Sequence, residues 1–234
     1  MQLVYEDSLE RTLEAVNDAL FWRKEVPAEE KARAANWLAS RQGLEDAYAG
    51  GFAPLPGEDQ LPSKTFIGDD LRRGGGKAHV LGEETSRALL LLGSDSPEVR
   101  EALARGNAAL AEHINPEKGF FCCYMCTVAT WRNLAWGGLD KQEQRLALGM
   151  ETLSEHRLVA GGWRGFPFWY TLSALFDMIE SGRGQRYAQA ELEWVSSYLK
   201  RRVRRLKSWE PWISRKAELG RRILAVVAPE EAEE

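Results

Sequence analysis

Apolar residues recur along most of the chain at the three- and four-residue spacing of amphipathic helices. Residues 6–23 show this pattern clearly, with Leu9, Leu13 and Val16 on one expected face. No segment convincingly shows the strict alternation that marks a half-buried strand. We therefore predict an all-α protein, with helices at 6–23, 27–42, 83–92, 97–113, 122–136, 140–156, 167–180, 185–207 and 214–227.

From residue 83 onward, the expected helices alternate between two kinds. Those that begin near residues 83, 122 and 167 are apolar nearly all round, whereas those that begin near 97, 140 and 185 carry charges on one face. Ser96 followed by Pro97 is a typical helix start, with Ser96 as the N-cap. The alternation predicts αα-hairpins in two layers, with the apolar helices inside and the amphipathic helices outside.

A short pattern repeats at a distance of 43 residues. L-x-E-H-x5-G occurs at 110–119 and again at 153–162. A period of this length is typical of a two-helix repeat. The repeated residues His113 and His156 then fall at equivalent ends of outer helices, where a histidine can bond the last carbonyl groups.

The segment 43–82 differs from the rest of the chain because glycine and proline recur and no period persists. A long connection of this kind is uncommon unless it is functional or disordered. We expect one domain at 1–228, with the 43–82 connection over one mouth of a cavity. The acidic tail at 229–234 is expected to be frayed.

Composition narrows the possible functions. The 234 residues are 44% hydrophobic and carry a net charge of −4, which indicates a globular chain with no global attraction to nucleic acid or membrane. No apolar run approaches the roughly 20 residues that span a bilayer. The N-terminal segment is acidic and amphipathic, so we expect no signal peptide and a cytoplasmic location. Nine tryptophans are many for this length and suggest an aromatic-lined interior or cleft.

Three segments resemble the repeats of the prenyltransferase and terpene-cyclase (squalene-cyclase-like) α/α-toroid family. They are WLASRQ with the following GGF at 37–52, GEETSRALLLLG at 82–93, and GGWRGFPFWYTLSAL at 161–175. The resemblance covers roughly residues 30–205. It implies an α/α toroid, open or minimal because the chain supplies only four to five hairpins. It also implies an apolar ligand, such as an isoprenoid, in a central cavity.

The usual catalytic motifs of that family are missing. Class II terpene cyclases carry Asp-x-Asp-Asp, and the nearest counterpart here is Asp69-Asp70 after Gly68. The Asp-x-Cys zinc pattern of protein prenyltransferases does not occur near the cysteines. The resemblance therefore extends to scaffold and cavity, because fold and activity separate readily.

Carboxylates and a histidine gather around the irregular connection and form the candidate catalytic set. Asp69, Asp70 and Glu83 can supply an acid and a base if their surroundings separate their pKa values. His79 lies just before an expected inner helix and is the histidine best placed for chemistry. The alternative is structural, with Glu83 in a first helical turn and the aspartates capping a turn.

A basic loop and a set of aromatic residues form the candidate ligand-binding set. Arg72, Arg73 and Lys77 flank three glycines, a composition suited to a phosphate or another anionic head group. The aromatic rings can line an apolar pocket or simply pack between repeats. The selected aromatic residues are Trp131, Trp163, Phe166, Trp169 and Tyr170.

The three cysteines lie within five residues, which does not fit a secreted disulfide framework. Cys123 and Cys126 have the C-x2-C spacing of a zinc site, so zinc is a possible cofactor. A second pair of ligands at metal-binding spacing is missing. The thiols can equally be small apolar groups in a buried helix or one reactive thiol.

Three functions remain open on this sequence. The first is a small-molecule binder or enzyme with an apolar or anionic-headed ligand. The second is a carbohydrate-active α/α-toroid enzyme that uses the same carboxylates and tryptophans. The third is a non-catalytic helical-repeat protein whose basic run at 200–207 binds nucleic acid, anionic lipid or an acidic partner, although such a run is more often a solvated helix face.

Overall fold

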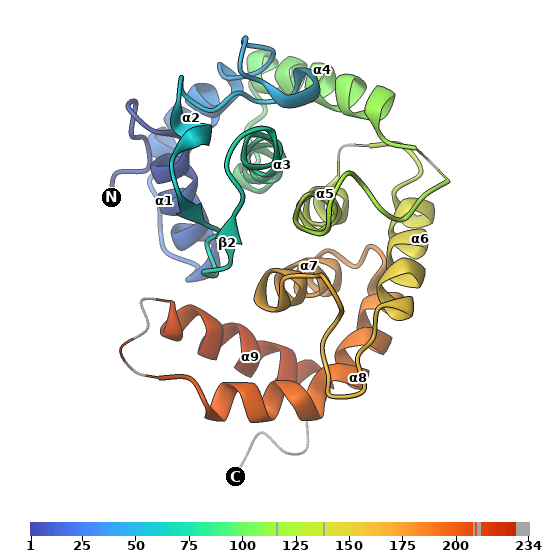
Figure 1. Cartoon of the computed structure of the whole chain (residues 1–234). Helices are drawn as coiled ribbons and strands as arrows, with labels where there is room; N and C mark the ends of the chain where they lie inside the picture. Colours follow the sequence, from blue (N-terminus) through green and yellow to red (C-terminus); the bar gives the residue numbers. More distant parts are fainter. Residues whose placement is uncertain (116, 138, 208, 210–211, 228–234) are drawn as a thin grey trace.

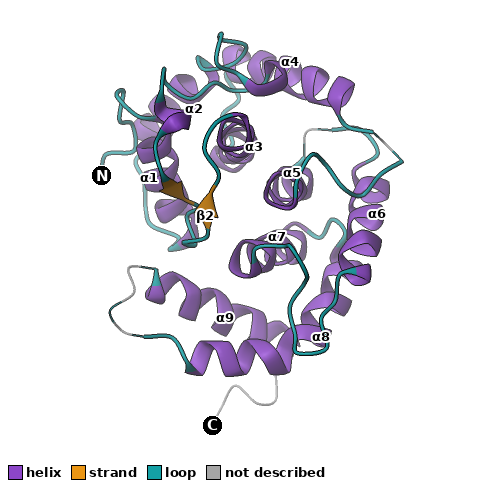
Figure 2. Cartoon of the chain, viewed as in Figure 1, coloured by secondary structure: helices purple, strands orange, loops and turns teal. Residues whose placement is uncertain are grey.

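The computed structural model of the chain describes residues 1–115, 117–137, 139–207, 209 and 212–227. The tail at 229–234 lies outside the described residues. Within them the protein is all-α apart from one small hairpin (Figures 1 and 2). The α-helices are α1 (Leu9–Phe21), α2 (Ala28–Ala39), α3 (Gly75–Leu92), α4 (Pro97–His113), α5 (Tyr124–Trp136), α6 (Gln142–Glu155), α7 (Phe168–Ser181), α8 (Gln185–Arg204) and α9 (Ile213–Val227).

Local signals fix several helix ends as predicted. The Ser96 side chain accepts a hydrogen bond from the backbone N–H of Val99 at 3.2 Å, and Pro97 occupies the first position of α4. The histidines of the repeat are confirmed at helix C-termini, where the Nδ1 atoms of His113 and His156 lie 2.9 and 2.8 Å from the carbonyl oxygens four residues earlier. These ends depend on residues close in sequence, which is why the sequence predicts them.

The predicted start of α3 was wrong by two turns, since the helix begins at Gly75 rather than at residue 83. Glycine disfavours a helix by about 1 kcal/mol per residue, which suggested a loop. However, Ala78, Val80 and Leu81 are buried, so tertiary packing extends the helix through the glycine-rich segment.

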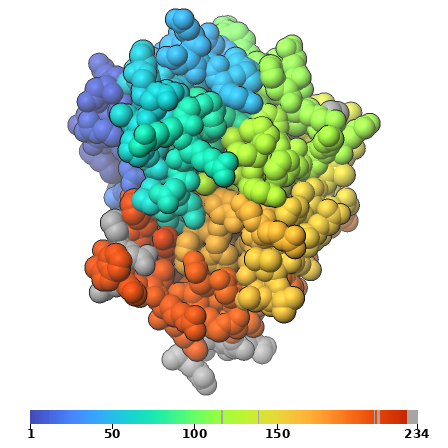
Figure 3. Space-filling view, viewed as in Figure 1, coloured from blue at the N-terminus to red at the C-terminus, as the bar shows by residue number. Residues whose placement is uncertain are grey.

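The connection between α2 and α3 has more structure than predicted. It contains two 3₁₀ turns, Tyr48–Gly50 and Glu58–Gln60, and a hairpin in which β1 (Ser63–Lys64) pairs antiparallel with β2 (Asp70–Leu71). The hairpin was not predicted because two-residue strands are too short to show alternation. Figure 3 shows this connection, coloured light blue to teal, spread over the face where the inner helices begin.

The helices form two layers that curve around the molecule (Figure 1). α3, α5 and α7 lie side by side and are seen nearly end-on, while α4, α6 and α8 follow them on an outer arc. α5 and α7 bury most of their residues, as the apolar pattern predicts for inner helices. Two buried apolar clusters result, one around α5 to α9 and one around α1 to α4.

The last helix returns to the first. The Arg215 guanidinium donates a hydrogen bond to the Phe66 carbonyl oxygen at 2.8 Å and pairs with Glu14 on α1. Arg222 donates to the Phe21 carbonyl oxygen at 2.9 Å, at the C-terminal end of α1. α9 therefore bridges the two ends of the arc.

Candidate functional site

A cavity of about 530 Å³ opens between α1, the β-hairpin, α3 and α7. Part of its wall is apolar and part is charged. The apolar residues are Leu13, Phe66, Leu71, Val80, Leu81 and Trp212. The charged residues are Glu10, Arg11, Glu14, Lys64, Asp70 and Glu84. A volume of this size suits a small molecule with an apolar body.

Glu84 is the most deeply buried carboxylate of this wall, with 7% of its surface exposed. Its Oε1 atom accepts hydrogen bonds from the Tyr170 hydroxyl and from Arg132 Nη1, both at 2.5 Å. Its Oε2 atom has no hydrogen-bond partner, and neither has the buried Ser63 Oγ of the same cavity. Leaving such groups unsatisfied costs about 1–3 kcal/mol each, so two residues of the cavity wall carry unpaired polar atoms just beneath its surface.

Behind Glu84 lies a buried ionic network that joins the three inner helices. Asp177 on α7 accepts hydrogen bonds from Arg87 on α3 at 2.6 and 3.0 Å, and from Arg132 on α5 at 2.7 Å. Trp136 Nε1 adds a fourth bond at 3.0 Å. Burial by itself raises the pKa of Asp177, but the two guanidinium groups outweigh it and hold the pKa below its ordinary value. The network therefore keeps Glu84 and Tyr170 in place.

The predicted catalytic carboxylates do not act together in this cavity. Asp69 Oδ2 accepts the backbone N–H of Tyr170 at 2.8 Å and so caps α7, whose own N-cap, Pro167, has no side-chain acceptor. Burial raises the pKa of Asp69 to about 6. Asp70 lines the cavity but is exposed and paired with Lys64.

Contrary to the prediction, the basic residues Arg72, Arg73 and Lys77 do not line the cavity. The Lys77 side chain is buried, and Nζ donates to Glu10 Oε2 at 2.8 Å and to the carbonyl oxygens of Glu58 and Leu61 at 2.9 and 3.1 Å. An ammonium group has three protons, so Lys77 has none left for an anionic ligand. Arg72 and Arg73 are exposed and do not line the cavity.

Of the five selected aromatic residues, Tyr170 alone lines the central cavity. Trp131, Trp163 and Phe166 do not line it and instead pack in the apolar cluster of the later repeats. The Trp131 and Phe166 rings stack with their centroids 5.4 Å apart, and Trp163 Nε1 donates to Glu191 at 2.9 Å. Packing between repeats accounts for these three rings.

Trp169 lies in a different place, beside the basic run of α8. It lines a surface cavity of about 330 Å³ together with Arg201, Arg202 and Arg205. Arg202 also lies over the Phe168 ring, 5.2 Å from its centroid. The run is therefore partly engaged with aromatic faces.

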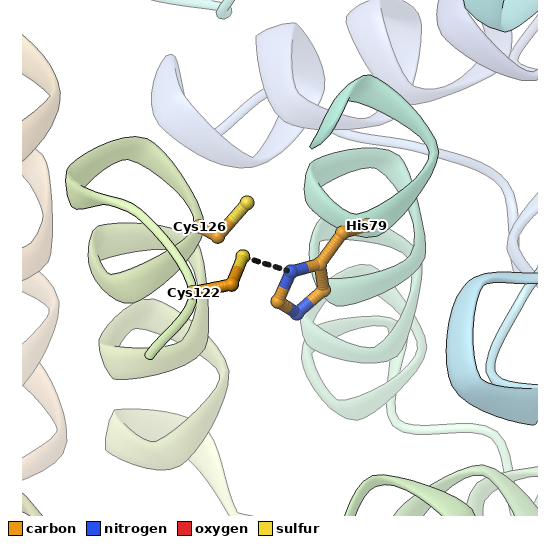
Figure 4. Close-up of side chains that lie close together, drawn as sticks. All are labelled: His79, Cys122 and Cys126. Atoms are coloured by element: carbon orange, nitrogen blue, oxygen red, sulfur yellow. Dashed lines mark hydrogen bonds between the residues drawn. The ribbon is translucent and has the colours of Figure 1, made fainter. Parts of the chain in front are cut away.

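The predicted residues His79 and Glu83 belong to a second cluster, which faces α5 (Figure 4). His79 Nδ1 lies 3.7 Å from Cys122 Sγ, and these two atoms and Cys126 Sγ all lie within 4.8 Å of one another. Figure 4 shows the imidazole on α3 and the two thiols on the α5 side pointing toward one another. The set combines one nitrogen and two sulfur ligand types that zinc accepts.

Glu83 orients the His79 ring from the opposite side. His79 Nε2 lies 3.1 Å from Glu83 Oε1, and Glu83 also accepts bonds from Thr130 Oγ1 at 3.0 Å and Asn133 Nδ2 at 2.7 Å. Because a carboxylate only accepts, Nε2 carries the proton and Nδ1 faces the thiols. Burial lowers the pKa of His79, but its bonds to Cys122 and Glu83 outweigh this and raise the pKa to about 9.

The structure groups Cys122, rather than the predicted Cys123, with Cys126 and His79. Cys123 is the N-cap of α5, and its Sγ accepts the backbone N–H of Cys126 at 3.4 Å. Hydrogen bonds from Cys126 lower the pKa of Cys123 to about 5, and the same contact raises the pKa of Cys126.

The sequence reasoning did not select Arg87, Arg132 and Asp177. A signal was present, because each is a charged residue inside a largely buried inner helix. Charged side chains are rarely buried unless they are paired, so three of them in three neighbouring helices indicate a network.

In the part of the chain that the structure describes, no helix combines the length and apolar character needed to cross a membrane. Comparison of the chain with protein-family models, curated proteins and solved structures found no match.

Proposed function

We propose that the chain is a small α/α toroid that binds a small molecule in its central cavity, as a binding protein or an enzyme. The alternation of inner and outer helices and the return of α9 to α1 support the toroid. The single observation that carries the function is a cavity of about 530 Å³ whose wall includes Glu84, a buried carboxylate with one unpartnered oxygen.

The ligand's chemistry follows from the polar residues of the cavity wall. Glu84 offers an acceptor, Ser63 Oγ offers a donor or an acceptor, and Lys77 is saturated. This arrangement favours a hydroxyl or amine group at the head of the ligand over the anionic head group expected from the sequence. The body of the ligand would lie against Leu13, Val80 and the other apolar wall residues.

Three probes separate the remaining alternatives. Farnesol has an apolar body and a hydroxyl donor, farnesyl diphosphate has the same body with an anionic head, and maltotriose represents a carbohydrate. A ligand at 100 times its Kd stabilises the folded state by about 2.7 kcal/mol, which raises the Tm by roughly 5–11 °C for a domain of this size. Native mass spectrometry of gently purified protein would detect a ligand that co-purifies.

The variant Glu84→Gln removes the negative charge and replaces one acceptor oxygen with an N–H₂ donor. Glu101→Gln on α4 is its matched control because Glu101 is exposed and outside the cavity. We expect farnesol to raise the Tm of the wild type and of Glu101→Gln, and to lose most of this effect in Glu84→Gln. If farnesyl diphosphate raised the Tm more than farnesol, the proposal that the ligand's head group is a hydrogen-bond donor would be wrong. Stabilisation by maltotriose alone would favour the carbohydrate enzyme, and no response with no co-purified ligand would favour the interaction protein.

A further inference from the structure

We infer that His79, Cys122 and Cys126 form a zinc site with one coordination position left to solvent. The set lies on another face of α3 from the central cavity, because the cavity is lined by Val80, Leu81 and Glu84. Zinc binding and ligand binding are therefore separate properties, and either can fail without the other.

The packing of the inner layer brings these ligands together. α3 and α5 are neighbours in that layer. His79 lies in the second turn of α3, and Cys122 lies just before α5 begins. Cys126 follows four residues later in the first turn of α5, so its thiol lies on the same side as Cys122.

The distances fit tetrahedral coordination. Zinc lies about 2.3 Å from sulfur and about 2.0–2.1 Å from nitrogen, which places a sulfur and a nitrogen ligand about 3.6 Å apart and two sulfurs about 3.8 Å apart. The Cys122 Sγ to His79 Nδ1 distance is 3.7 Å, and no pair in the set is separated by more than 4.8 Å. A side-chain movement of about 1 Å is enough to complete the three bonds.

A second layer of contacts prepares His79 as a ligand. Glu83 Oε1 lies 3.1 Å from His79 Nε2 and accepts its proton in a hydrogen bond. In the neutral ring this leaves the Nδ1 lone pair for the metal. Thr130 and Asn133 hold Glu83 in turn. A carboxylate bonded to the far nitrogen of a ligating histidine is the usual support in zinc sites.

The exposure of the three ligands shows on which side the open coordination position of the zinc would lie. His79 and Cys126 are buried and Cys122 is exposed, so solvent reaches the site from the Cys122 side. The Tyr48 and Phe121 rings lie 4.4 and 4.5 Å from the His79 ring and close its other sides. Cys123 Sγ is engaged as the N-cap of α5, which leaves three protein ligands. Three protein ligands with water in the fourth position are typical of zinc sites that activate water.

The test uses the full chain, purified under reducing conditions, stripped with a chelator and reloaded with Zn²⁺. Zinc retained after desalting is measured by elemental analysis, and affinity is measured by competition with a chromophoric chelator. Zinc binds the thiols as thiolates and releases their protons to solvent. Cobalt(II) substitution adds a readout of ligand type, since thiolate ligands give charge-transfer absorption and a tetrahedral site gives intense d–d bands.

We expect one zinc per chain. Cys122→Ser is the decisive variant because the exposed side chain leaves the core intact, and we expect it and His79→Gln to weaken binding more than about 100-fold. Glu83→Gln should weaken binding by about 10–100-fold, as for other supports of a ligating histidine. Circular dichroism checks that each variant is folded.

Two matched controls complete the design, Cys123→Ser for the thiols and His113→Gln for the histidine. Both should bind zinc within about threefold of the wild type. The absence of stoichiometric zinc, or equal affinity in Cys122→Ser and the wild type, would overturn the site. Loss of zinc binding in Cys123→Ser would show that Cys123 is the fourth ligand, and it would overturn the inference that one coordination position is open to solvent.

Discussion

Replacing Asp177 by asparagine tests the buried network that joins the inner helices. Asp177 accepts four hydrogen bonds, three from the guanidinium groups of Arg87 and Arg132 and one from Trp136. Asparagine has nearly the same volume, but it removes the charge and turns an N–H₂ group toward donors. Both arginines stay buried without their shared counter-ion.

The magnitude follows from these contacts. Hydrogen bonds to charged groups contribute about 1.5–3 kcal/mol each, and breaking a buried ion pair costs about 3–5 kcal/mol. We expect Asp177→Asn to lower the free energy of unfolding by about 3–5 kcal/mol and the Tm by roughly 6–20 °C. Glu180→Gln is the matched control, since Glu180 lies on the same helix and pairs with Arg23, whose side chain is 77% exposed. Its cost should stay below about 1 kcal/mol.

The assay is urea unfolding at several pH values. Because the pKa of Asp177 is lowered in the folded state, its contribution is present above the unfolded pKa near 4 and is lost as the pH falls through the folded pKa. The wild type should therefore lose stability in acid more steeply than Asp177→Asn. If Asp177→Asn costs no more than Glu180→Gln, the network does not hold the inner helices together, and the reasoning fails.

Two further predictions test packing and titration. A Cβ at Gly149 would lie 2.4 Å from Trp131 Nε1, so Gly149→Ala should destabilise the protein by about 1–3 kcal/mol in urea unfolding. Gly76→Ala meets no atom within 4 Å and should instead stabilise it by about 0.5–1 kcal/mol; destabilisation by both variants alike would contradict the packing argument. The pKa of Asp69 is raised from 3.8 to about 6, so the folded state holds the proton more tightly and stability falls by about 3 kcal/mol as the pH rises from below 4 to above 6. Asp69→Asn should remove this step from the pH profile, and an unchanged profile would show that another group titrates.

The candidate sites were only partly predictable. His79 was selected because it lies just before an expected inner helix, and Glu83 because it belongs to the carboxylates around the same connection; the structure finds the two in contact. The zinc ligand Cys122 was passed over because C-x2-C spacing drew attention to Cys123, whereas the actual grouping depends on which thiol faces α3. Lys77 was predicted to bind an anion because it is a basic residue next to three glycines. In the structure its ammonium group is buried against three acceptors, and the fold of the 43–74 segment decides this.

The sequence by itself determined most of the helices, several of their ends and their division into apolar and amphipathic kinds. These features depend on side chains within a few residues of one another, so spacing along the chain is enough to predict them. Tertiary structure decided the rest. The bridge from α9 to α1, the capping of α7 by Asp69 and the pairing of Asp177 with two arginines join residues 45 to 201 positions apart. Such contacts depend on how the layers pack, and packing also decides whether a charged residue faces a cavity, a partner or a metal ligand.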